Sequence, residues 1–140
     1  MRELTIRVPS FPPSLNKASR NWWVNHEEAG EFADMVRLCA IDARNRWEGK
    51  RRWPTLDKAI IFVTFIVPES RHGPMPDAHN LFGSMKKAID VLTARPSGTG
   101  EYARVGIGLI ADDAPTCLTW GNVGVIREGT EEVTEIVIRG

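Results

Sequence analysis

The sequence lacks the features that mark several large classes of protein. Its 18 basic and 18 acidic residues give a formal net charge of zero, so no overall basic field indicates binding to nucleic acid. The two cysteines, Cys39 and Cys117, lie in apolar segments without the spacing of a metal site, and we interpret them as reduced core thiols. No apolar run approaches the roughly 20 residues of a membrane span, and residues 1–6 lack the apolar region of a signal peptide. We therefore expect a soluble cytoplasmic protein with no membrane partner.

The length of the chain favours one domain, and the order of its charges favours separate basic and acidic surfaces. With 140 residues the chain can bury a real core, and no linker interrupts it, so we expect a single domain over 1–140. Basic residues are in excess up to Lys58, whereas acidic residues are in excess from Ala111 to the end. A net charge of zero can therefore hide a basic surface for phosphates around an acidic metal site.

Hydrophobic periodicity predicts an α+β fold with a mixed sheet of about four strands packed against two main helices. Apolar residues alternate over 4–8 and predict a first strand, whereas 59–67 is apolar on both faces and predicts a strand in the sheet interior. Two further strands are expected over 117–126 and 132–139. Gly129 lies in the turn between them, which favours an antiparallel hairpin.

The two helices are predicted over 27–47 and 80–92, where apolar residues recur at three- and four-residue steps. At about 100° per residue, the second helix also gathers polar positions on a different face. That face consists of His79, Gly83, Lys86 and Asp90.

Two acidic segments, at Asp77 and at Asp112–Asp113, flank this second helix. Carboxylates that converge in space hold a divalent cation, and a lysine beside them can neutralise a phosphate. We predict Asp77 and Asp113 as the main ligands of Mg²⁺, Asp112 as a supporting ligand, and Lys86 as the positive charge that faces the scissile phosphate. His79 could be a softer ligand that favours Mn²⁺, could bind a metal-bound water, or could mark a site that has lost activity.

Each of these residues also has a purely structural interpretation. Asp77 could cap the second helix, Asp112–Asp113 could form an ordinary turn, and Lys86 could be a solvated helix lysine. Spacing alone does not choose between the two sets of interpretations.

Basic residues near three loops are candidate contacts to DNA phosphates. The loop over 14–23 is rich in Asn, Lys, Arg and Trp, and short basic clusters follow further along the chain. Ordinary surface loops are the alternative. The candidate residues are Lys17, Arg20, Arg51, Arg52 and Arg71.

The order of these motifs resembles the RusA family of Holliday junction resolvases, which are endonucleases associated with phages and prophages. The motifs are Pro12-Pro13-Ser14-x-Asn16, Asp77-x-x-Asn80-Leu81, Lys86, Asp90-x-Leu92 and Asp112-Asp113. The resemblance spans nearly the whole chain and its central motif is moderately specific. It implies a homodimer with two metal sites that makes paired symmetric nicks in a four-way DNA junction during recombination and repair. It also implies the cytoplasm of a bacterial host, Mg²⁺ or Mn²⁺ as cofactor, and supporting roles for Asn16, Asn80 and Asp90.

The chain departs from the family pattern at two places. His79 stands where the family has a second motif aspartate, which removes one negative charge from the expected site. The segment 93–104 is longer than the usual link before Asp-Asp and could contact the junction or the other subunit. Two rival hypotheses follow: a protein that binds branched DNA but has weakened or lost cleavage, and a phage structural or partner-binding domain.

Overall fold

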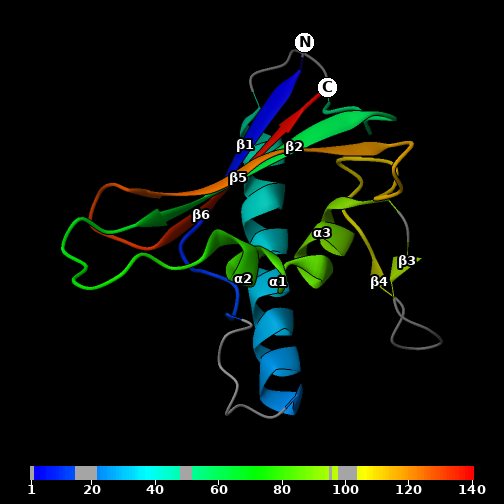
Figure 1. Cartoon of the computed structure of the whole chain (residues 1–140). Coiled ribbons are helices and arrows are strands. Elements are labelled where there is room, and N and C mark those ends of the chain that lie inside the picture. The colour runs from blue at the N-terminus through cyan, green and yellow to red at the C-terminus, as the bar shows by residue number, and fades with distance from the viewer. Residues whose placement is uncertain (1, 15–21, 48–51, 95, 98–103) are drawn as a thin grey trace.

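The fold is described from a computed structural model, which places residues 2–14, 22–47, 52–94, 96–97 and 104–140 (Figure 1). Its elements along the chain are β1 (Glu3–Val8), α1 (Trp22–Arg46), β2 (Ala59–Val67), α2 (Ala78–Phe82), α3 (Lys86–Leu92), β3 (Pro96–Ser97), β4 (Arg104–Val105), β5 (Leu118–Arg127) and β6 (Val133–Arg139). The predicted α+β class is confirmed, because helices pack against a four-stranded mixed sheet.

The four main strands lie in the order β1-β6-β2-β5. β6 is antiparallel to both of its neighbours, and β2 is parallel to β5. The predicted hairpin of the last two strands is therefore wrong, because β2 lies between them. Their turn is instead attached to the end of β2, where Glu69 N donates to Gly129 O at 2.9 Å and Glu128 N donates to Val67 O at 2.9 Å. The backbone of β2 gives a physical reason, since its N–H and C=O groups on both edges are satisfied only when β5 and β6 pair with opposite edges.

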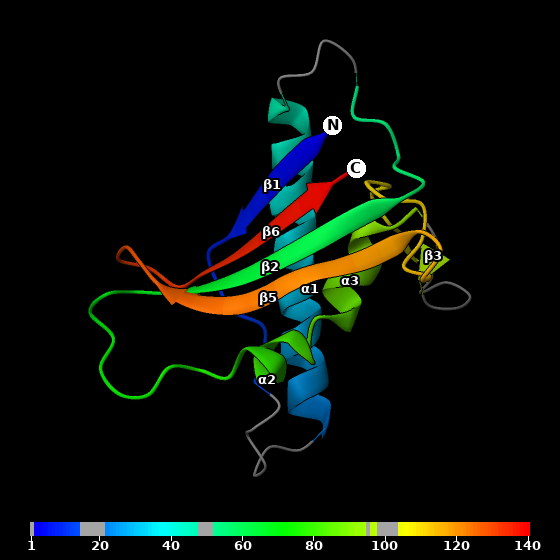
Figure 2. The ribbon, with the colours of Figure 1, turned by 45° about the horizontal axis from the view of Figure 1, so that its top comes forward.

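The interior position predicted for β2 is confirmed, but its two faces differ. Ala59, Ile61, Val63 and Phe65 are buried, whereas Ile60 on the opposite face is 39% exposed. Figure 2 shows why: the helices lie behind one face of the sheet and leave the other uncovered. The apolar residues on both faces of β2 predicted that both faces are buried, but the helices cover only one of them.

α1 is the long helix that covers the sheet, and it begins at Trp22, earlier than predicted. Its predicted apolar face is confirmed, with Phe32, Val36 and Ala40 buried. The helix packs against both β1 and α3. Both cysteines are free and half-buried, and Cys39 packs at the edge of the core.

The second predicted helix is two helices, α2 and α3. After α2 the chain turns through Gly83, and the hydrogen bonds shorten to a three-residue step, from Ser84 N to Leu81 O and from Met85 N to Phe82 O. Glycine and serine are weak helix formers, which explains the break at this point. The predicted continuous face is therefore interrupted: His79 belongs to α2, whereas Lys86 and Asp90 belong to α3 and pair there at 3.1 Å.

The segment 93–104 contains β3 and the first residue of β4, and these two short strands pair antiparallel. Its residues 95 and 98–103 lie outside the described residues. Within the part of the chain that the structure describes, no helix combines the length and the apolar character needed to cross a membrane.

Candidate functional site

The segment 106–110 runs along the end of α3 and brings Asp113 to that helix. Ile107 N donates to Val91 O at 2.8 Å, and Leu109 N donates to Leu92 O at 2.9 Å. These bonds satisfy backbone carbonyls that the end of a helix leaves without partners. Gly106 packs so closely that a Cβ atom built on it would lie 1.8 Å from Thr93 O. Sequence reasoning missed this docking, although a glycine before an apolar run is a signal for close backbone approach.

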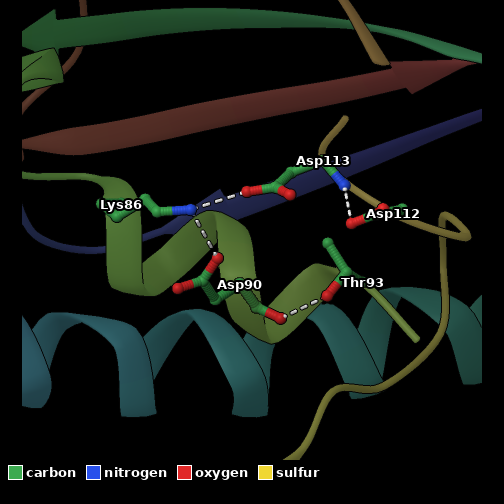
Figure 3. A network of polar contacts seen from close by, with 5 residues as sticks. All are labelled: Lys86, Asp90, Thr93, Asp112 and Asp113. Carbon is green, nitrogen blue, oxygen red and sulfur yellow. Dashed lines mark hydrogen bonds and ion pairs between the residues drawn. The ribbon is translucent and has the colours of Figure 1, made fainter. Parts of the chain in front are cut away.

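Lys86 is the centre of a polar network between α3 and the Asp112–Asp113 segment (Figure 3). Its Nζ donates to Asp113 Oδ2 at 2.7 Å and to Asp90 Oδ1 at 3.1 Å. Asp112 Oδ1 accepts a 2.8 Å hydrogen bond from the backbone N of Asp113. The network thus joins four of the predicted residues, and Asp90, predicted in a supporting role, is the second carboxylate on the ammonium.

The network stabilises the charged forms of Lys86 and Asp113. The hydrogen bond from Lys86 lowers the pKa of Asp113, despite an opposing effect of partial burial. The hydrogen bonds to Asp113 and Asp90 in turn raise the pKa of Lys86. The lysine side chain remains 72% exposed and the two carboxylates about 30% exposed, so the site is open to solvent.

Asp77 is the N-cap of α2. Its Oδ1 accepts hydrogen bonds from His79 N at 2.8 Å and from Asn80 N at 3.4 Å. The alternative that Asp77 caps a helix is therefore confirmed, although capping leaves its other oxygen without a hydrogen bond from the described residues. His79 is exposed. No hydrogen bond or ion pair among the described residues joins Asp77 or His79 to the Lys86 network.

The carboxylates of Asp113 and Asp90 are chemically suited to binding a divalent cation. Asp113 and Asp90 converge on one position, and that position holds a cation, the Lys86 ammonium. Mg²⁺ commonly takes one or two protein carboxylates and completes its shell with water. Across the described ranges, no group of three or more His, Cys, Asp and Glu side chains could hold a metal ion, so one site containing both Asp77 and Asp113 stays a prediction.

Neither a protein-family model nor a curated protein matches the sequence. The similarity to RusA nucleases therefore depends on the motif residues alone. Of those residues, Asn16 lies outside the described part of the chain, and Asn80 is half-buried in α2.

Asp77 also borders a cavity of about 740 Å³ that sequence reasoning did not predict. Pro12 and Pro13 form one wall, at the end of the segment that follows β1, and Arg71 lines another. Glu28 lines the cavity too, so it is of mixed charge. No sequence signal reveals it, because its walls come from segments far apart in the chain.

The predicted DNA-contacting residues are only partly placed. Arg71 is half-buried at the cavity, and Arg52 is exposed near the start of the segment that leads to β2. Lys17, Arg20 and Arg51 lie outside the described residues. The predicted basic surface stays a prediction.

Proposed function

We propose that this protein is a divalent-metal-dependent endonuclease that resolves four-way DNA junctions by paired symmetric nicks, as a RusA-like homodimer. The observation that carries the proposal is the Asp113–Lys86–Asp90 network. It places a carboxylate suited to a metal and an ammonium suited to a phosphate within one hydrogen bond of each other. The order of motifs along the chain supports the same reaction class.

In this proposal Asp113 is the principal ligand of Mg²⁺ or Mn²⁺, supported by Asp112 and Asp77, with His79 as a softer donor. A cation bound there would supply Lewis-acid stabilisation of the negative charge on the scissile phosphate. Lys86 adds a second positive charge on the same phosphate, because its ammonium has a third N–H donor beyond the two carboxylate contacts.

The solvent exposure of the Lys86 side chain is consistent with a duplex DNA substrate. Lys86 reaches a surface that is mostly accessible, so a phosphate backbone can approach the ammonium without an enclosed pocket. Phosphate contacts position the duplex and carry no sequence information by themselves. Arg52 and Arg71, together with Lys17, Arg20 and Arg51, are the proposed contacts of this kind.

The second candidate function is binding of branched DNA with weakened or lost cleavage. Two proposed ligands are already engaged by the protein itself, since Asp77 caps α2 and Asp113 pairs with Lys86. A metal must compete with Lys86 for Asp113, the cap leaves it one oxygen of Asp77, and His79 contributes no negative charge to help it. These observations favour weak metal binding.

One experiment separates the two functions. A labelled four-way junction and a linear duplex of the same sequence are incubated with the protein in Mg²⁺ or in Mn²⁺. The variants are Asp113→Asn and, as a matched control, Asp42→Asn, which removes another exposed helix-paired carboxylate. Paired nicks in the junction that persist in the control and disappear in Asp113→Asn support the nuclease.

Other outcomes point elsewhere. Salt-sensitive junction binding without nicks in either metal supports the binding protein. Nicks that are undiminished in Asp113→Asn contradict the proposed site, and absence of DNA binding at low salt contradicts both functions.

A further inference from the structure

The two carboxylates that hold the Lys86 ammonium come from different parts of the chain. Asp113 reaches it from the segment after Ile110, whereas Asp90 lies one helical turn along α3 from Lys86 itself. Figure 3 shows the ammonium between them. The remainder of the lysine side chain is solvated, so its position depends on these two contacts at its tip.

The two contacts respond differently to a second cation. Asp113 is the proposed metal ligand, so a divalent cation competes with Lys86 for its carboxylate. The four-residue spacing on α3 keeps Asp90 beside Lys86 whether or not Asp113 is engaged. The Asp90 backbone is also held, because Asp90 O accepts hydrogen bonds from Thr93 Oγ1 at 2.8 Å and Thr93 N at 3.3 Å.

We propose that Asp90 is a positioning residue for Lys86. It retains the ammonium next to the Asp113 carboxylate when another cation takes Asp113, so that Lys86 stays where the substrate phosphate binds. The catalytic benefit of this role rests on the proposed function, but Asp90 holds the Lys86 ammonium in the free protein as well. Without Asp90, the flexible four-carbon side chain of Lys86 would disperse into solvent once Asp113 is taken.

The expected effect is modest, because the pair lies on an exposed helix surface. An exposed i,i+4 pair changes an equilibrium by roughly twofold. Asp90→Asn should therefore lower the single-turnover rate of junction cleavage by about that factor, and should lower it no further when Lys86 is already glutamine. An Asp90 that acted as a metal ligand would instead lower the rate in both backgrounds.

The first measurement needs neither metal nor DNA. The ¹⁵N signal of the Lys86 ammonium is identified by its loss in Lys86→Gln and is then recorded in three further variants. Asp113→Asn imitates an Asp113 carboxylate that a bound cation has neutralised, and the Lys86 signal should persist in this variant. It should be lost in the double variant Asp113→Asn with Asp90→Asn, and should be unchanged in Asp42→Asn, which breaks a similar exposed pair with Arg46.

Loss of the signal in Asp113→Asn alone, or its survival in the double variant, overturns the retention. An equal effect of Asp90→Asn on cleavage with and without Lys86 overturns the positioning role. If the wild-type protein cuts no junction, the nuclease proposal fails, and the ammonium signal still decides whether Asp90 holds Lys86.

Discussion

Replacement of Gly106 by alanine tests the contact that carries Asp113 to α3. The added Cβ would lie 1.8 Å from the carbonyl oxygen of Thr93 and 2.8 Å from its carbonyl carbon. Both atoms belong to the backbone, so no side-chain rotation relieves the clash. One of the two segments must move by roughly 1.5 Å to restore van der Waals contact.

Such a movement breaks the hydrogen bonds on either side of the clash. The bonds from Ile107 N to Val91 O at 2.8 Å and from Gly108 N to Thr93 O at 3.2 Å are the nearest ones. Each contributes about 1 kcal/mol net, and overpacking of a close contact costs about 1–3 kcal/mol. We expect Gly106→Ala to lower the free energy of unfolding by roughly 3–5 kcal/mol.

Chemical and thermal unfolding measure this change. At about 4 °C per kcal/mol for a domain of this size, the midpoint should fall by roughly 12–20 °C. Gly124→Ala is the matched control, because nothing lies within 4 Å of the Cβ built on Gly124 in β5. It should change the free energy by less than about 0.5 kcal/mol. A Gly106→Ala protein as stable as the control would refute the docking of 106–110 on α3.

Three further results are expected. Asp77→Ala should lower stability by about 1 kcal/mol through loss of the α2 cap, whereas Asp77→Asn should not, because asparagine caps equally well; equal melting temperatures of the two variants would contradict the cap. Lys86 lowers the pKa of Asp113, so the ion pair stabilises the fold above the ordinary aspartate range and the contribution is lost as pH falls through the lowered pKa. The difference in unfolding free energy between wild type and Lys86→Gln should therefore be constant from neutral pH to about pH 5, at about 0.2–1 kcal/mol, and should shrink below about pH 4; a difference that grows in acid would oppose this account. Burial, followed by the charge of Asp42, raises the pKa of Cys39, so Cys39 should react with iodoacetamide more slowly in the folded than in the unfolded protein, and faster in Asp42→Asn; equal rates in all three would show that its environment is ordinary.

The sequence predicted those parts of the fold that depend on local patterns. Period-two alternation located β1, and the three- and four-residue steps of α1 identified its buried face, because both patterns record which side of one element meets the core. Strand order has no such local signature. The turn at Gly129 therefore predicted a hairpin, although β2 lies between the two strands.

The candidate site was predictable in the same uneven way. Asp113 and Lys86 were assigned to one site by residue type, as a metal ligand and a phosphate contact, and the structure joins them by a hydrogen bond of 2.7 Å. The interruption at Gly83 was not predicted, since one glycine within a helical pattern is often tolerated. That interruption places His79 in another helix, so the polar face inferred from helical spacing is continuous only from Lys86 to Asp90.

The position of β6 between β1 and β2 has a consequence for the order of folding. β6 follows every other strand in the chain, yet it supplies the only sheet partner of β1 among the described strands and one of the two partners of β2. Pairing of residues 3–8 with 134–139 closes a loop of nearly the whole chain, and such contacts slow folding because the entropy of loop closure must be overcome first. We expect β2 and β5 to pair early in folding. β1 should remain without a partner until β6 has joined the sheet.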